Sequence, residues 1–351
     1  MPPHKKRSPN LNIVAVAKQA GVSPATVSRV LNNYPHIREE VRTKVLETID
    51  QLGYERNRVA QRLRAAKSHL IGMIVTDITN PFFNTIMASI ENVFFADGYS
   101  LLMSNTASAP EKELAYLSMM ENEGVAGLVI ATTSENVDEV AELADKGMPI
   151  VIIDRRIAKG RVDMVLSDNI AGARSAVEHL IGHGHTRIGH IGGPMHLTSG
   201  RERYKGYQQA MAGAGLPVEE AWVRFGDHKH QSGYEQTHAL LSKHPELTAL
   251  FIENNMMTLG ALNAIHDLAM RIPDDIAIVG FDDMPWAVSL NPPLTTVAQS
   301  THEIGTRVAT CLLERIAQPD LPARIELVPT MLIVRASCGA AHQHTITENE
   351  R

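Results

Sequence analysis

From residue 68 onward, short apolar runs rich in β-branched residues alternate with longer segments of helical periodicity. The runs include IGMIV, GLVIA and IVIID, and each ends in polar or glycine residues. Strands that alternate with helices form doubly wound parallel sheets, which bind ligands at the carboxyl ends of their strands. Residues 68–340 are long for one such sheet. The sequence therefore predicts an α/β body of two similar halves, divided near Ser167–Asp168, with 291–300 as a crossover to the first half. Helical patterns lie near 84–97, 111–123, 135–146, 170–182, 201–214, 232–243 and 256–269.

A separate helical segment precedes this body. The apolar residues of 11–20 are spaced as in a helix, and Gly21 is expected to end that helix. A later amphipathic helix, the third in this segment, is expected over 38–52. Between them Ser23 caps a helix whose first turn holds Pro24, where the missing N–H is tolerated. Two helices joined by a short turn that contains glycine indicate a helix-turn-helix motif, whose second helix enters the DNA major groove. The alternative is a three-helix core without DNA-binding function.

Charge is distributed unevenly along the chain. Residues 1–67 carry 13 Lys and Arg against 5 Asp and Glu, although the whole chain has a net charge of -6. A basic head on an acidic body predicts a polyanionic partner for the head alone, unless the head is only a solvated basic tail. Residues 54–67 form a basic linker with helix propensity, and residues 341–351 are expected to be disordered.

Several classes of protein are disfavoured by absent signals. No signal peptide and no apolar run long enough to span a membrane is found, and the two cysteines lie far apart, so a cytoplasmic protein without disulfides is expected. The glycine cluster at 189–194 lacks the dinucleotide-binding context. The HGH, HKH and HQH strings lack metal-ligand partners, and no catalytic motif appears. No metal and no cofactor is predicted.

The strings AVAKQAGVSPATVSRVLN, GYERNRVAQRLR and IGMIVTDITNPFF resemble the lactose-repressor/galactose-repressor family of bacterial transcription regulators. HLIGHGHTRIGHIGGP, SGRERYKGYQQAM and PPLTTVAQ carry the same resemblance, which covers roughly 11–338. The body is also similar to ribose-type periplasmic sugar-binding proteins. The resemblance implies a homodimer that binds a palindromic double-stranded DNA operator and is controlled by a small carbohydrate-like effector.

The resemblance also implies the domain boundaries. It gives a basic tail over 1–10, a helix-turn-helix domain over 11–56, a hinge helix over 57–67 and an effector-binding and dimerisation domain over 68–340. Within the last, the N-subdomain takes about 68–167 and 298–327, and the C-subdomain takes about 168–297 and 328–340. The dimer interface is expected on helices of the first half, near 84–97 and 111–123.

In this family the first residues of the second helix read bases. Pro24 and Ala25 can make only apolar contacts with them, whereas Arg29 can pair in bidentate fashion with guanine. A leucine that matches Leu63 wedges between base steps in the minor groove. The remaining predicted DNA contacts serve phosphates, helix caps or the hinge: Ser23, Thr26, Ser28, Asn32, Asn57, Arg58 and Ala60.

Polar residues at strand ends and a pair of aromatic residues predict the effector pocket. Sugar rings stack on aromatic faces, and their hydroxyls need fixed donors and acceptors. Motif positions shared with ribose-binding proteins select Asn80, Phe82, Phe83, Asp154, Arg155, Arg201, Asn254, Asp282 and Gln299. Two positions depart from the pattern, because Asn255 replaces an aspartate and His228, also a candidate ligand, replaces an aromatic lid residue. A neutral aldose is preferred, and a sugar acid, a sugar phosphate or a purine remains open.

Two other functions are weighed against a regulator. A transport-type sugar-binding protein is disfavoured by the missing signal peptide and the basic head. An enzyme that uses Asp154 and Asp282 as acid and base is disfavoured because neighbouring arginines should lower both pKa values. The sequence therefore predicts a non-enzymatic transcriptional repressor, in which effector binding reorients the two halves of the body and changes operator affinity.

Overall fold

A computed structural model describes residues 13–31, 34, 37–52, 68–135, 137–158 and 160–339. The chain forms two compact units, one within residues 1–68 and one within 69–351. The predicted hinge helix over 57–67, Asn32 and the tails lie outside the described residues.

The first unit contains three short helices, α1 (Ile13–Ala20), α2 (Pro24–Leu31) and α3 (Glu39–Leu52). Gly21 ends α1 in the left-handed conformation, with φ 66°, and the Ser23 hydroxyl accepts the Thr26 N–H at the start of α2. The small core is formed by Val16, Ala17, Ala20, Val27, Val30 and Val45. The helix pattern predicts Leu46 to face inward, but it is 48% exposed because Val45 fills that core position.

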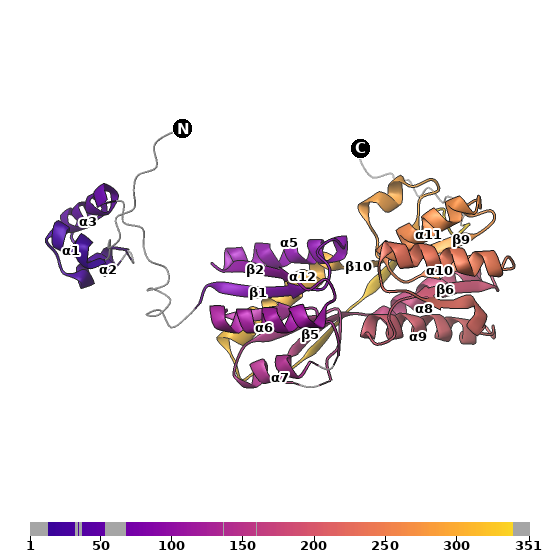
Figure 1. The fold of residues 1–351 in the computed structure, drawn as a ribbon, viewed down its shortest axis with the longest axis horizontal. Coiled ribbons are helices and arrows are strands. Elements are labelled where there is room, and N and C mark those ends of the chain that lie inside the picture. The colour runs from indigo at the N-terminus through magenta and orange to yellow at the C-terminus, as the bar shows by residue number, and fades with distance from the viewer. Residues whose placement is uncertain are drawn as a thin grey trace, which may run out of the picture. The chain divides into compact units, whose positions relative to one another are not determined.

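The first lobe of the large unit is a six-stranded parallel sheet (Figure 1). Helices α5 (Pro81–Ala96) and α12 (Thr301–Ala317) pack against one face of it. Helices α6 (Pro110–Glu123) and α7 (Asp138–Asp145) pack against the other. In spatial order the strands are β11 (Ile325–Val328), β5 (Asp163–Ser167), β4 (Ile150–Ile153), β3 (Gly127–Ile130), β1 (Leu70–Val75) and β2 (Ser100–Asn105).

The second lobe repeats this plan with its own six-stranded sheet. One face is covered by α8 (Asn169–Gly182) and α9 (Thr198–Gly213), the other by α10 (His230–Lys243) and α11 (Asn255–Asp267). All strand pairs are parallel except β10–β12. In spatial order the strands are β12 (Thr330–Ile333), β10 (Thr295–Gln299), β9 (Ala277–Phe281), β8 (Ala249–Ile252), β6 (Ile188–Gly192) and β7 (Val223–Phe225).

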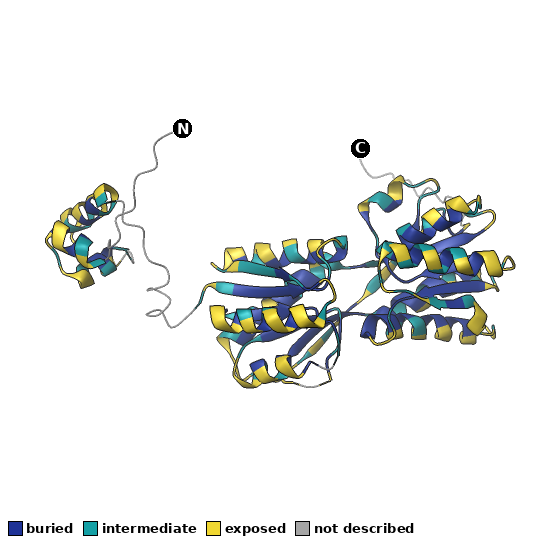
Figure 2. Cartoon of the chain, viewed as in Figure 1, coloured by how far each residue is buried: buried dark blue, intermediate teal, exposed yellow. Residues whose placement is uncertain are grey.

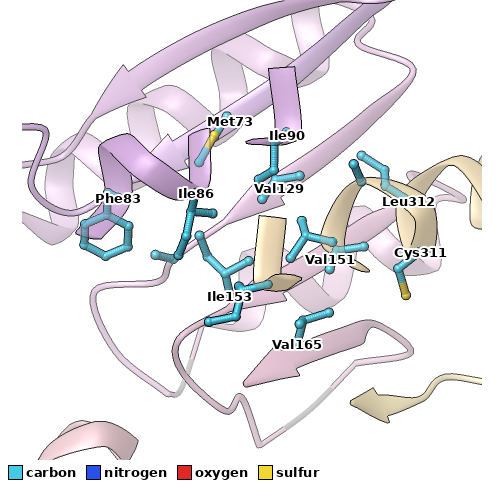
Figure 3. Packing of buried hydrophobic residues seen from close by; sticks show 14 of the residues in the cluster. Met73, Phe83, Ile86, Ile90, Val129, Val151, Ile153, Val165, Cys311 and Leu312 are labelled. Carbon is cyan, nitrogen blue, oxygen red and sulfur yellow. The ribbon is translucent and has the colours of Figure 1, made fainter. Parts of the chain in front are cut away.

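The chain passes between the lobes three times. It leaves the first sheet after β5, returns after β10 to form α12 and β11, and crosses again to β12. The central strands of both sheets are buried on both faces, whereas the edge strands β2, β7, β11 and β12 are partly exposed, as are the outer helix faces (Figure 2). Aliphatic residues such as Ile86, Val129 and Leu312 interlock α5, the sheet and α12 (Figure 3). The predicted α/β body with two parallel sheets is confirmed.

Strand direction determines where polar residues gather. Residues directly after β1, β4, β6, β7, β8 and β9 lie at carboxyl ends of parallel strands, where side chains of different strands converge. No helix in the described part of the chain is long and apolar enough to cross a membrane.

Candidate functional site

A cavity of about 210 Å³ lies between the two lobes, at the carboxyl ends of their strands. Its wall includes Asp77 after β1, Asp154 after β4, Asn254 after β8 and Asp282 after β9. Four of its residues are non-glycine residues with left-handed backbone: Ser108 (φ 61°), Asp154 (66°), His228 (66°) and Asp282 (74°). Such strained conformations concentrate at ligand-binding and catalytic sites, because the surrounding structure must hold them in place.

The cavity brings together every predicted effector residue except Arg201. It is lined by Asn80, Phe82, Phe83, Asp154, Arg155, His228, Asn254, Asp282 and Gln299. Their roles as effector ligands stay a prediction. Further polar wall residues outside the predicted set include Asp77, Thr133, Ser199, Arg203 and Lys229.

Arg201 points away from the cavity. Its guanidinium Nη2 donates to both carboxylate oxygens of Glu135, each at 2.7 Å, and its side chain is 43% exposed. Residues two apart on a helix face opposite directions. The cavity instead receives Arg203, which belongs to the buried stripe of α9 with Tyr207 and Ala210. Helical periodicity would have selected Arg203, because 203, 207 and 210 share one face.

Arg203 is held rigidly at the base of the cavity. It is 3% exposed, and its Nε donates to the Asn169 side-chain oxygen at 2.8 Å. Its Nη1 donates to the Glu253 backbone oxygen at 2.6 Å, and its guanidinium lies 3.9 Å above the centre of the Phe281 ring. A guanidinium that three contacts already orient can donate its remaining N–H groups to a ligand with little further loss of side-chain conformational entropy.

Asp282 is the cavity carboxylate with the most constrained surroundings. One oxygen accepts the Gln299 side-chain N–H at 2.5 Å and the other accepts the Asn255 backbone N–H at 3.3 Å. Burial raises the pKa of Asp282, and the nearby Arg203 only partly offsets this effect. The prediction that arginines lower this pKa is therefore wrong, because desolvation outweighs the charge attraction at a carboxylate that is 5% exposed.

Several predicted ligands also have structural partners. Asn80 caps α5 by accepting the Phe82 N–H at 3.0 Å, and it accepts the Asn255 side-chain N–H from the opposite lobe at 2.9 Å. Asn254 caps α11 through the Met257 N–H at 2.8 Å. These amides define the shape of the cavity as well as its polarity.

The aromatic pair is partly a core feature. Phe82 and Phe83 are each 5% exposed and belong to the hydrophobic cluster between α5, α12 and the sheet. Their ring centroids are 5.2 Å apart at an interplanar angle of 71°. An edge-to-face pair leaves parts of ring surface for an apolar ligand face. In the same lobe, Arg155 is 5% exposed and donates to the Thr132 carbonyl oxygen.

In the small unit, α2 separates a buried face from an accessible one. Val27 and Val30 are buried, whereas Pro24, Ala25 and Arg29 are exposed. Ser23 is also exposed, and Thr26 and Ser28 are half-buried. An exposed row at the beginning of a second helix is the surface that a helix-turn-helix motif presents to base edges. The other predicted DNA contacts, Asn57, Arg58, Ala60 and Leu63, lie outside the described residues.

Family comparison covers both units. Residues 68–335 match the periplasmic binding proteins and sugar-binding domain of the LacI family, and residues 12–57 match the bacterial regulatory proteins of the lacI family. The chain belongs to the LacI/GalR family. It is a DNA-binding transcriptional repressor of this family. Members bind DNA and small-molecule effectors as dimers.

Individual relatives agree with this assignment. The HTH-type transcriptional repressor PurR of Haemophilus influenzae is 36% identical over 323 residues, with 91% of this chain and 96% of that protein covered. The lac repressor dimer bound to operator and the anti-inducer ONPF has a TM-score of 0.83 at 28% identity, with 94% and 99% covered. A LacI-family regulator from Enterococcus faecium with bound ribose has a TM-score of 0.70 at 29% identity, with 76% and 98% covered.

Proposed function

We propose that this repressor responds to a small hydroxyl-rich molecule, a monosaccharide or a derivative of one, that binds in the cavity between the lobes. The observation that supports this proposal most strongly is that each lobe places a carboxylate beside a buried guanidinium in the cavity wall. Half-buried Asp154 lies 3.6 Å from Arg155 in one lobe, and buried Asp282 lies near Arg203 in the other. A carboxylate accepts hydrogen bonds and a guanidinium donates them. Together they satisfy adjacent hydroxyls, each of which both donates and accepts.

The size of the cavity favours a ligand with one ring. Pockets for drug-sized ligands usually measure about 300–1,000 Å³, and this cavity is smaller, at about 210 Å³. The solved relative with bound ribose supports the same class of ligand. A purine is the second candidate, because a planar base can also lie against Phe82 or Phe83. We propose no catalysis: both Asp282 oxygens already accept hydrogen bonds, and the relatives are named repressors.

The proposed mechanism couples the cavity to the relative orientation of the lobes. The Asn255–Asn80 hydrogen bond joins the lobes beside the cavity, and the Arg201–Glu135 ion pair joins them outside it. A ligand that contacts both walls binds the closed arrangement of the lobes more tightly than the open one. This difference in affinity shifts the equilibrium between the two arrangements. On the outer helices, Phe95 is 75% and Leu114 41% exposed, which supports a dimer interface over α5 and α6. The lobe movement would change operator affinity through this interface, in the cytoplasm where the operator lies.

A thermal-shift screen tests the effector class. D-ribose, other aldoses, D-gluconate, D-ribose 5-phosphate and hypoxanthine are added to the full chain, and the melting temperature is followed as each concentration rises. A ligand at 100 times its Kd stabilises the folded state by about 2.7 kcal/mol. We expect a sugar or sugar derivative to raise the melting temperature without being turned over. A shift with hypoxanthine alone would replace the sugar proposal with the purine one, and product formation would contradict the binding role.

Arg29→Ala is expected to weaken operator binding by about 5- to 150-fold, since one bidentate guanine contact contributes about 1–3 kcal/mol of discrimination. The operator is first selected from random DNA with the wild-type chain, and affinity is measured by fluorescence anisotropy at fixed salt. Lys18→Ala, an exposed basic residue on α1, is the matched control for loss of charge. An equal loss for both variants, or an equal loss on random DNA, would show that Arg29 contributes only charge.

A further inference from the structure

Behind one wall of the cavity, two histidines contact the same buried carboxylate. Glu253 directly follows β8, His190 lies in β6, and His228 lies in the loop after β7. Glu253 Oε1 is 3.3 Å from His228 Nε2, and Glu253 Oε2 is 3.5 Å from His190 Nε2. The side chains of Glu253 and His190 are fully buried, and that of His228 is 19% exposed and lines the cavity.

Two glycines make room for this cluster. A Cβ on Gly193 would lie 2.0 Å from His228 Nε2 and 2.4 Å from Glu253 Oε1. A Cβ on Gly192 would lie 2.7 Å from His190 Nε2. Any side chain at residue 193 would therefore displace the imidazole from the carboxylate. The backbone of His228 is fixed as well, because its carbonyl oxygen accepts the Asn254 side-chain N–H at 3.1 Å.

A buried carboxylate needs a positive partner. Burial alone would raise the pKa of Glu253, but the nearby imidazoles of His190 and His228 lower it below the usual value, so the carboxylate stays ionised. Of the two rings only His228 is hydrogen-bonded to the carboxylate, since His190 Nε2 approaches it at 3.5 Å without a hydrogen bond. The Arg203 guanidinium bonds to the backbone oxygen of Glu253 and to Asn169, and no bond from it to the Glu253 carboxylate is seen among the described residues. The two imidazoles are therefore the groups that can neutralise this carboxylate.

The surroundings make His228 the imidazole of this cluster that faces the cavity. His190 stacks between Tyr204, Tyr207 and Phe251, and Phe225 meets its edge. His228 is 19% exposed and makes the shorter contact to Glu253, at 3.3 Å against 3.5 Å for the fully buried His190. The other charged groups on this wall are Arg203, Asp227, Lys229 and Asp282. Asp227 bonds to Ser232 and the Lys229 backbone N–H.

We propose that Glu253 is a positioning residue that holds His228 as a protonated hydrogen-bond donor toward the effector, with His190 as the second imidazole of the cluster. This inference rests on the proposed effector function of the cavity. The Nε2–H of His228 points to the carboxylate, which leaves Nδ1–H of the cation for an oxygen acceptor of the ligand. The cavity would then select a ligand with a hydroxyl, carboxylate or phosphate oxygen at this wall. Binding of the effector would be coupled to protonation of one group, His228.

Glu253→Gln in the full chain tests the linkage, because it retains the side-chain shape and removes the charge. Affinities for D-ribose, D-gluconate and D-ribose 5-phosphate are measured by calorimetry at pH 6 and pH 8. Histidine loses its proton over this interval, so we expect wild-type affinity to fall on the order of tenfold toward pH 8. The variant should bind more weakly at pH 6 and lose most of this pH dependence. The ligand whose affinity changes most identifies the acceptor as hydroxyl, carboxylate or phosphate.

Glu246→Gln is the matched control, since Glu246 pairs with His244 at 3.0 Å away from the cavity wall. It should leave the pH dependence unchanged. Titration of Asp282 would act with the opposite sign, since protonation of this acceptor weakens binding toward low pH. Equal pH profiles for wild type and Glu253→Gln would overturn the proposal.

A ligand-free measurement separates this proposal from the effector assignment. Nitrogen-15 NMR of histidine side chains in the full chain reports which ring nitrogen carries a proton. We expect both Nε2 and Nδ1 of His228 to be protonated at pH 6 in the wild type, whether or not any of the three probes binds, and a proton on Nε2 alone would overturn the cationic donor. An unprotonated Nε2 would place a lone pair against the carboxylate and overturn the arrangement, whereas failure of all probes with both nitrogens protonated would count against the effector class alone.

Discussion

Arg203→Met is expected to reduce effector affinity by about 10- to 150-fold. The substitution removes a charged donor from the cavity wall, and a hydrogen bond to a charged group contributes about 1.5–3 kcal/mol. It also leaves the Asn169 side-chain oxygen and the Glu253 carbonyl oxygen without their donor in a buried site. Asp282 would lose the nearest cation that lowers its pKa, so this pKa should rise further.

The matched control for this prediction lies two residues away on the same helix. Arg201→Met removes an identical group that pairs with Glu135 outside the cavity, and it should change affinity several-fold at most. Calorimetry with a ligand identified by the thermal-shift screen measures both variants, and circular dichroism shows whether each is folded. If Arg201→Met had the larger effect, the assignment from motif comparison would be right and the assignment from geometry wrong.

Arg315→Met is expected to destabilise the large unit by about 3–5 kcal/mol, because it leaves a buried carboxylate without its counter-ion. Arg315 on α12 bonds to both oxygens of Asp163 on β5, at 2.8 and 3.1 Å, and the two side chains are 7% and 1% exposed. The same guanidinium donates to carbonyl oxygens of Pro319, Leu321 and Pro322. One side chain therefore fixes the segment that leads from α12 to β11.

Urea unfolding monitored by circular dichroism measures this loss. The control is Arg271→Met, which removes an exposed pair with Asp275 and should cause no measurable change, since exposed pairs contribute little. The double variant Arg315→Met/Asp163→Asn should recover part of the stability, because it removes the unpaired charge. An unchanged free energy of unfolding in Arg315→Met would show that the attraction between Arg315 and Asp163 only offsets the cost of removing both charges from water.

Much of the fold follows from local sequence patterns. The period of the apolar residues predicts most helices of both units to within a few residues, as for 111–123 against Pro110–Glu123 and 170–182 against Asn169–Gly182. Helix α12 (Thr301–Ala317) is not among the predicted segments. Short strands at the edges are harder to predict, because β7 has three residues and β11 and β12 are partly exposed. Their apolar content is too low to distinguish them from loops, and their pairing depends on partners far away in the chain.

The candidate site also contains residues that the sequence predicts and residues that only the tertiary structure identifies. Asp154, Asn254 and Asp282 can be predicted because each follows a strand, and parallel strands end at the same edge of the sheet. Arg201 and Arg203 look equivalent in SGRERYKGY, and only the direction that each takes from α9 separates a ligand-facing group from an ion pair between the lobes. The partnership of His190 and Glu253 with His228 likewise depends on the adjacency of β7, β6 and β8.

By itself, the sequence determined the helix-turn-helix segment, the two-lobed parallel body and the family, because these depend on periodicity, capping and motif spacing along the chain. The tertiary structure alone decided which arginine enters the cavity and that the pKa of Asp282 rises. It also decided that Glu253 is buried between two imidazoles. These properties depend on desolvation and on contacts between residues distant in sequence, and neither quantity is encoded in local spacing.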